Sequence, residues 1–506
     1  MSPPSSKPPE GYLGADARIG SGPAPAMVEA GYALEVADGP LLHPGLNLAD
    51  LAHVLALAEG GTLALADRDR LLGALVELCA IDAADFDFDV RYGDAYNSRE
   101  RYLEERIGHS AGWLAAGRPR REAGRIAFRM ALRGRILSLT EGVARFADAL
   151  IEVAERHTGT IMADYTYLQV AQPATFGHYL LSFVYPALRD GARLQESFVW
   201  VNRSPGGAGG VAGSRFPLDR SRLAERLGFD GVIEHTRDAM WQTDGLVSLL
   251  GAASVAATNA SRFAEDLEIY TSSEFGLMSI GDEVCRASVL IPQKRNPYAL
   301  SVIRGGAGTL IGRAAGLMAT QRTPSARTDN LLYAYGEVCG AIDMTTRVID
   351  LAAAVAASLE PNERAMTSAA RERFATATDL AEAICQATGL DYRSSYRVVG
   401  RAVADAMEKG LGSGAVDAAS IARAAEEVLG EPLEVAPEVI TDALDPAAAI
   451  VSRTATGGAA PEPMKEMIED CRQRAGDMAE WSTGRREATT NAEQLLIERV
   501  KRLLGR

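Results

Sequence analysis

The sequence has few of the residues that build disulfide frameworks or metal sites. It contains five cysteines and six histidines in 506 residues. The cysteines are odd in number and widely scattered, which argues against a disulfide framework and a zinc cluster and favours a reducing cytoplasm. No two histidines lie three or four positions apart, so we expect neither a metal nor another cofactor. The cysteines are Cys79, Cys285, Cys339, Cys385 and Cys471.

The sequence also lacks an excess of positive charge. It has 52 Lys and Arg residues against 67 Asp and Glu residues, a formal net charge of −15, and nothing indicates a nucleic-acid-binding surface. No apolar run approaches the roughly 18 to 20 residues that cross a bilayer, and the N-terminus lacks the charged-then-apolar layout of a signal peptide. We expect a soluble protein whose local basic patches would bind small anions.

Helical periodicity is abundant. Apolar residues recur every three or four positions in stretches such as 128–157, 176–202 and 245–270, and few segments alternate as strands do. The sequence predicts an all-α fold of three regions whose centre is a bundle of long helices. The expected parts are a mobile Pro- and Ser-rich arm at 1–25, an N-terminal helical domain at 26–113, a central bundle at 114–360 and a C-terminal helical domain at 361–506.

One polar loop between the helical stretches carries candidate chemistry. The segment Ser288-Val-Leu-Ile-Pro-Gln-Lys-Arg-Asn-Pro297 offers a hydroxyl at Ser288, a cation at Lys294 and an amide at Asn296. This set can hold a carboxylate while a proton is moved. Because Pro, Ser, Lys and Asn are also ordinary loop residues, the loop alone leaves a catalytic and a structural interpretation open.

The loop resembles the signature of the aspartase/fumarase superfamily, Gly-Ser-Ser-x-Met-Pro-x-Lys-x-Asn-Pro, and its Pro-Gln-Lys-x-Asn-Pro core is most similar to the argininosuccinate lyase branch. Further segments resemble that branch in order, at 163–173, 202–213 and 374–400, and the resemblance runs from about residue 85 to 462. It implies a homotetramer whose central helices form one long bundle, with each active site assembled from three chains.

The resemblance implies an elimination. A base removes a proton from the carbon beside a carboxylate, and the leaving group departs from the neighbouring carbon, usually releasing fumarate. Ser288 matches the proton-abstracting serine, and Lys294 and Asn296 match the residues that bind the carboxylate and hold the developing charge. Thr166 and Gln169 match substrate-positioning residues, although a solvated helix start is an alternative interpretation of both.

This sequence departs from the family pattern at positions that are expected to contact the substrate. Tyr167 stands where the family has a histidine that commonly helps to protonate the leaving group; a tyrosine, with a reference pKa of about 10, could still donate a proton. In Leu114-Ala-Ala-Gly-Arg-Pro-Arg-Arg-Glu122, Arg120 keeps the family arginine, but Arg121 replaces a substrate-binding asparagine.

The third substrate-contacting segment departs further. Arg327 and Leu332-Tyr-Ala-Tyr335 stand where argininosuccinate lyases have a tyrosine and a Gln-Glu-Asp-Lys run, so the guanidine-side contacts are largely gone and argininosuccinate is not the expected substrate. The added arginines would suit carboxylate, phosphonate or nitro oxygens. The alternative is a surface patch paired with nearby glutamates. The arginines are Arg118, Arg120, Arg121 and Arg327, and the glutamates are Glu104, Glu105 and Glu122.

Two classes of function remain open. The favoured one is a lyase that cleaves an N-substituted aspartate to fumarate and an amine, or runs that addition backwards. Within this class, a variant ejects a stable anion such as nitrite from a substituted succinate, which needs little protonation and would explain Tyr167 and the arginines. The other class is a catalytically retired family member with a structural or accessory role.

Overall fold

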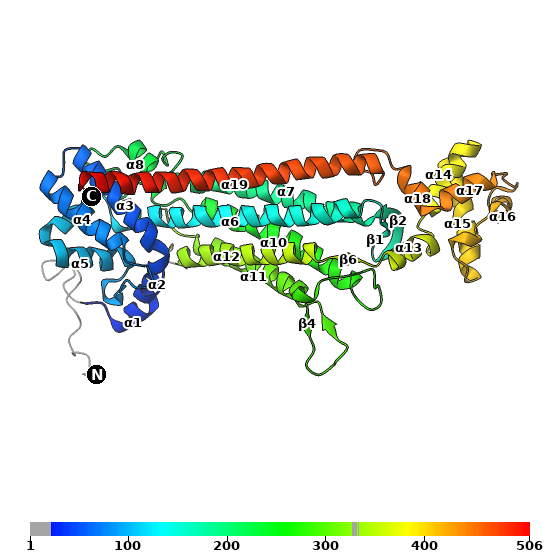
Figure 1. Cartoon of the computed structure of the whole chain (residues 1–506), viewed down its shortest axis with the longest axis horizontal. Coiled ribbons are helices and arrows are strands. Elements are labelled where there is room, and N and C mark those ends of the chain that lie inside the picture. The colour runs from blue at the N-terminus through cyan, green and yellow to red at the C-terminus, as the bar shows by residue number, and fades with distance from the viewer. Residues whose placement is uncertain (1–21, 326–330, 332, 506) are drawn as a thin grey trace.

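The computed structural model describes residues 22–325, 331 and 333–505. The chain is mainly helical and contains three two-stranded antiparallel sheets within these residues, which confirms the predicted all-α class. Long helices run side by side along one axis, with the N-terminal helices at one end and a smaller helical group at the other (Figure 1). Residues 1–21 of the predicted mobile arm lie outside the described residues, and α1 begins at Pro25.

The N-terminal end combines short helices with three longer ones. The elements are α1 (Pro25–Met27), a π-helical turn (Val28–Tyr32), α2 (Ala33–Ala37), α3 (Gly39–Glu59), α4 (Leu65–Cys79), a 3-10 turn (Val90–Tyr92), α5 (Ala95–Ile107) and a second 3-10 turn (Gly108–Ala115). The buried side chains of this end belong to the same hydrophobic cluster as those of the central bundle. The predicted regions 26–113 and 114–360 therefore share one core.

Helix α3 is long and apolar enough, by length and composition, to cross a membrane. This corrects the expectation that no segment approaches that length. Most of the helix is buried within the fold, and its buried residues include the polar side chains His43, Asp50 and His53, each with a hydrogen-bond partner. We therefore interpret α3 as a core helix.

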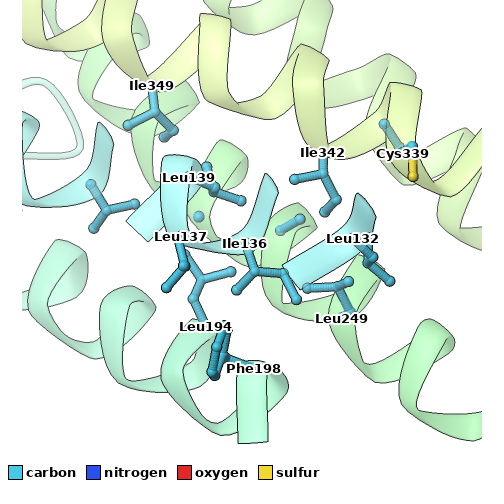
Figure 2. Close-up of a cluster of buried hydrophobic side chains, with 14 of the residues drawn as sticks. Leu132, Ile136, Leu137, Leu139, Leu194, Phe198, Leu249, Cys339, Ile342 and Ile349 are labelled. Atoms are coloured by element: carbon cyan, nitrogen blue, oxygen red, sulfur yellow. The ribbon is translucent and has the colours of Figure 1, made fainter. Parts of the chain in front are cut away.

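The central bundle consists of six long helices. They are α6 (Arg120–Arg156), α7 (Phe176–Val201), α10 (Asp244–Tyr270), α11 (Tyr298–Thr320), α12 (Tyr335–Ala357) and α19 (Pro461–Leu503). Figure 2 shows how side chains of α6, such as Ile136, pack between Phe198 of α7, Leu249 of α10 and Ile342 of α12. Burial of such apolar side chains, at about 25 cal/mol per Å² removed from water, is the main stabilising contribution to the bundle.

The C-terminal region divides differently from the prediction. A separate hydrophobic cluster unites α14 (Ala377–Thr388), α15 (Tyr392–Glu408), α16 (Ala418–Leu429) and α17 (Pro437–Leu444). In contrast, α19 is 43 residues long and returns along the bundle, where Met464, Cys471 and Met478 join the main core. The smaller elements of this region are α13 (Glu363–Glu372), a 3-10 turn (Ser413–Ala415) and α18 (Pro446–Val451).

Short strands and helices connect the long ones. β1 (Ile161–Thr166) pairs with β2 (Gln169–Thr175) in antiparallel register, with Ile161 opposite Thr175 and Thr166 opposite Gln169. β3 (Met278–Ser279) pairs with β6 (Glu360–Pro361), and β4 (Arg286–Ala287) pairs with β5 (Arg295–Asn296). The remaining elements are α8 (Arg220–Arg226), α9 (Thr236–Ala239) and a 3-10 turn (Asp282–Val284).

A buried ionic network ties α3 to the segment that precedes α6. The Asp50 carboxylate accepts a hydrogen bond from Arg99 at 2.7 Å and one from Arg118 at 2.6 Å, and all three side chains are essentially inaccessible to solvent. Arg99 also donates to Asn47 at 2.7 Å and lies 3.0 Å from Nδ1 of His43. Since buried charges are tolerated only when they are paired and hydrogen-bonded, this network fixes α3, α5 and the Arg118 segment relative to one another.

Stability is expected to fall as the pH drops below about 6.5, because of His43. Burial and the Arg99 guanidinium lower the pKa of His43 to about 4. Between pH 4 and about 6.5, the folded state therefore binds fewer protons at His43 than the unfolded state does. The stability that neutral His43 contributes is fully present above the unfolded pKa and is lost as the pH falls towards 4. We expect the free energy of unfolding, measured with urea, to decrease between about pH 7 and pH 5. In His43→Gln this decrease should be smaller than in the wild type by about 1 to 2 kcal/mol. His109→Gln, at an exposed position, is the control, and equal pH dependences for all three proteins would contradict the assignment.

Candidate active site

The hairpin β4–β5 carries three of the predicted site residues. Its strands pair Arg286 with Asn296, and across the loop the Ser288 N–H donates to the Lys294 carbonyl at 3.3 Å. The Asn296 amide donates to the Arg286 carbonyl at 3.0 Å. The hairpin extends away from the helical bundle (Figure 1), and Lys294 is exposed. Ser288, Lys294 and Asn296 thus belong to one projecting element.

The local conformation of the loop points two backbone N–H groups at the Ser288 hydroxyl oxygen. Oγ of Ser288 accepts hydrogen bonds from the backbone N–H groups of Ile291 at 3.0 Å and Leu290 at 3.3 Å. Donors that point at a hydroxyl oxygen stabilise the negative charge that this oxygen carries after losing its proton. The sequence predicted the serine but gave no sign of these two donors, because they arise from the turn of the loop.

The β1–β2 hairpin carries Thr166, Tyr167 and Gln169, so the alternative of a solvated helix start is wrong. Thr166 and Gln169 face each other as the last pair of the ladder, and Tyr167 and Leu168 form the turn with φ angles of 54° and 58°. Residues other than glycine adopt such left-handed angles at a cost of about 1 to 3 kcal/mol, and they cluster at functional sites. Tyr167 is 99% exposed, so this strained turn presents its phenol to the surroundings.

A cleft of about 350 Å³ lies beside this turn and contains acidic groups that the sequence analysis did not single out. The Tyr179 hydroxyl donates to Asp266 at 3.3 Å, and burial raises the pKa of the Asp266 carboxyl. Asp164 and Tyr270 also line this cleft. These residues come from β1, α7 and α10, and their separation in the sequence leaves no local motif.

Arg120 and Arg121 begin helix α6 and are both paired with carboxylates. Arg120 donates to Asp94, and Arg121 makes two hydrogen bonds with Glu35. The surface-patch alternative expected paired arginines, but two of the glutamates that it named, Glu104 and Glu105, pair with Arg101. Arg327 lies outside the described residues.

Glu122, which follows the two arginines, holds the glycine-rich turn. Its buried carboxylate accepts the backbone N–H groups of Gly207 at 2.6 Å and Gly209 at 2.8 Å. The φ angles of these glycines, 75° and 61°, belong to the left-handed region that a side chain would strain. Two segments that were recognised separately in the sequence, 114–122 and 202–213, therefore form one structural unit.

The structure does not bring the predicted site residues together within one chain. Arg120 is the first residue of α6, whereas Thr166 follows its far end, and a helix of 37 residues spans about 55 Å at 1.5 Å per residue. The β4–β5 hairpin projects from the bundle between these two ends (Figure 1). The three groups lie at separate places on the molecule.

Comparisons with known proteins decide the family. The family model described as lyase matches residues 51–312, and the model described as argininosuccinate lyase C-terminal matches residues 374–451. Argininosuccinate lyase of Methanothermobacter thermautotrophicus is 31% identical over 422 residues, which are 83% of this chain and 90% of that protein. The argininosuccinate lyase of Halobacterium salinarum is 34% identical over 438 residues, covering 86% and 88%. The chain belongs to the aspartase/fumarase superfamily, in its argininosuccinate lyase-like branch.

A solved structure extends this likeness to the whole chain. EDDS lyase in complex with formate superposes with a TM-score of 0.86 at 26% identity and covers 99% of both chains. An EDDS lyase variant with bound fumarate superposes with a TM-score of 0.84 at 26% identity over 98% of both chains. The protein is a carbon–nitrogen lyase of the fumarate-releasing kind. Within its described residues, no group of three or more His, Cys, Asp or Glu side chains could hold a metal ion.

Proposed function

We propose that this lyase catalyses the reversible elimination of an amine from an N-substituted aspartate, giving fumarate. The observation that supports it most is the Ser288 loop, where a hydroxyl with two backbone donors lies on the same hairpin as Lys294 and Asn296. The likeness to EDDS lyase over 99% of both chains supports a substituted succinate. Argininosuccinate itself is not proposed, since the positions that contact its guanidine side differ in this chain.

The proposed roles follow from the negative charge that develops on the substrate carboxylate during the elimination. Ser288 removes the proton beside the substrate carboxylate, and the C–H electrons pass into the carboxylate to give a dianion that Lys294 and Asn296 stabilise. The C–N bond then breaks, the double bond of fumarate forms, and the nitrogen leaves as an amine after accepting a proton. Tyr167 is the proposed donor of that proton, and Thr166, Gln169 and Arg120 position the dicarboxylate.

We propose that the active site is shared between chains of a homotetramer. One chain keeps its three groups of site residues apart, with the roughly 55 Å length of α6 between Arg120 and Thr166, and only another copy can complete each group. Helix α11 supports assembly, because Ile311 and Met318 are seven positions apart, and so on one face of this bundle helix, and are 53% and 51% exposed. Apolar side chains exposed along one helix are typical of a surface that a further chain covers.

The ion pairs favour an amine over a small anion as the leaving group. Part of the support for the anion-ejecting variant came from the arginines added near the expected pocket, which would suit nitro oxygens. Arg118 is paired with Asp50, Arg120 with Asp94 and Arg121 with Glu35. Because each of these guanidiniums already has a carboxylate partner, the local positive charge is largely compensated.

The proposed function is tested by following the ultraviolet absorbance of fumarate. Purified protein receives fumarate with a panel of amines, and separately a panel of substituted succinates that includes argininosuccinate and nitrosuccinate. Loss of fumarate with one amine, together with mass-spectrometric detection of the N-substituted aspartate, is the expected result. Turnover of nitrosuccinate alone would favour the anion-ejecting variant, and an assembled protein that neither turns over nor binds fumarate would favour a retired lyase.

Replacement of Tyr167 by phenylalanine should lower the rate of amine release by about a hundredfold, the usual contribution of a positioned general acid. The change removes only the phenolic hydroxyl of a side chain that is 99% exposed, so the fold should not change. Tyr392→Phe, at a position 43% exposed in the C-terminal region, is the control. Initial rates are measured with the amine that the fumarate assay identifies. An unchanged rate in Tyr167→Phe would show that the phenol does not protonate the leaving amine.

A further inference from the structure

A carboxylate from the beginning of the chain fills the guanidinium fork of Arg121. Nη1 of Arg121 lies 2.5 Å from Oε2 of Glu35, and Nη2 lies 3.0 Å from Oε1. Two parallel hydrogen bonds are the geometry in which arginine binds a substrate carboxylate. The side chains are 17% and 11% exposed, so the pair is largely removed from water.

The space around this pair is small and already contains compensated charges. The cavity has a volume of about 30 Å³, and its polar lining includes Glu35, Asp38, Asp94, Arg120 and Arg121. That volume holds about one to two water molecules and no further carboxylate. A second carboxylate brought to Arg121 would have to displace Glu35 and would lie beside Asp38.

Asp38 also disfavours a further carboxylate beside Arg121. It lies at the junction between α2 and α3, next to Glu35, and the backbone N–H of Gly336 hydrogen-bonds to its carboxyl. Burial raises the pKa of Asp38 to about 6, with a further contribution from the charge of Glu35. An anionic group added to the ligand at this wall would therefore meet two carboxyl groups, which disfavours its binding.

We propose that Glu35 is a specificity-determining residue that occupies the carboxylate-binding fork of Arg121 and so excludes leaving amines that carry an additional carboxylate. This inference rests on the proposed function, because it assigns Arg121 to the side of the site that receives the amine. Arg120 differs from Arg121 here: it is paired with Asp94, but its side chain is 34% exposed, so we propose that the substrate dicarboxylate can reach it.

The kinetic test uses two amines of similar size, propylamine and β-alanine, in which a carboxylate takes the place of a methyl group. With fumarate as co-substrate, Glu35→Gln should raise the ratio of kcat/KM for β-alanine over propylamine about tenfold, because the carboxylate of β-alanine can take the place of the Glu35 carboxylate on Arg121. Glu35→Asp keeps the charge but shortens the side chain by one methylene, and it should give a smaller rise. Glu29→Gln, exposed on the same segment, is the matched control. An unchanged ratio in Glu35→Gln would overturn the proposal.

A binding measurement separates failure of this inference from failure of the proposed function. Calorimetry with propane-1,2,3-tricarboxylate should show binding to Glu35→Gln about tenfold tighter than to the wild type, whether or not any amine turns over. The double variant Glu35→Gln/Arg121→Gln should lose this gain, which assigns it to the guanidinium. If none of the tested amines leads the wild type to consume fumarate, the proposed function fails. The comparison of binding affinities still decides the role of Glu35 in that case. Equal affinities in the wild type and Glu35→Gln would refute it.

Discussion

Replacing Ser288 by alanine should lower kcat by about a hundredfold to ten-thousandfold while leaving the fold intact, since a positioned general base contributes about 10² to 10⁴. The hydroxyl oxygen accepts the N–H groups of Leu290 and Ile291 on a projecting hairpin, and its loss affects only this loop. Fumarate absorbance measures the rate, and circular dichroism together with the assembly mass establishes that the fold persists.

Gln293→Ala is a suitable control for this result, because Gln293 is exposed in the same loop. Its activity should stay within a few-fold of the wild type. A Ser288→Ala protein that retained more than a tenth of the wild-type rate would show that another group removes the proton.

Replacing Asp50 by asparagine should destabilise the protein by about 3 to 5 kcal/mol, the usual result of removing one partner from a buried ion pair. Arg99 and Arg118 would keep their positive charges at positions that are 0% and 2% exposed, without the carboxylate that both contact. Urea unfolding at neutral pH measures the loss.

The control for Asp50 is Asp69→Asn. Asp69 pairs with Arg68 at 2.7 Å, but its side chain is 47% exposed, and such pairs contribute at most about 1 kcal/mol. A similar small loss for Asp50→Asn would show that the network does not fix α3 against α5 and the Arg118 segment.

The sequence predicted the long helices α6, α7 and α10 but did not predict the length of α19. Helices α6, α7 and α10 contain many apolar residues, because each buries a wide face in the core. Helix α19 instead contacts the bundle through a narrow stripe that includes Met464, Ile468 and Cys471, so its 43 residues contain few apolar positions and the sequence did not predict it as one long helix. The β1–β2 turn was missed because Tyr167-Leu168 is not one of the Asn-Gly or Gly-rich pairs that signal such a turn.

The residue types of the candidate site could be predicted, but their partners could not. Motif matches gave Ser288, Lys294 and Arg120, since these residues lie in recognisable local segments. Glu35 and Asp50 were not singled out, because they lie 86 positions from Arg121 and 68 positions from Arg118. Contacts between such distant positions depend on the packing of α2 and α3, which no local pattern encodes.

The most direct test of a site assembled from separated segments is to mix two inactive variants of the lyase. Ser288→Ala disables the projecting hairpin, and Arg120→Met disables the start of α6. Each should be inactive alone, whereas assemblies formed by dissociating and reassociating the mixture should regain activity, at most about a quarter of the wild-type rate. That bound follows from random mixing of chains if each site needs both segments from different copies. Mixed assemblies that are verified by native mass spectrometry and remain inactive would contradict a shared site.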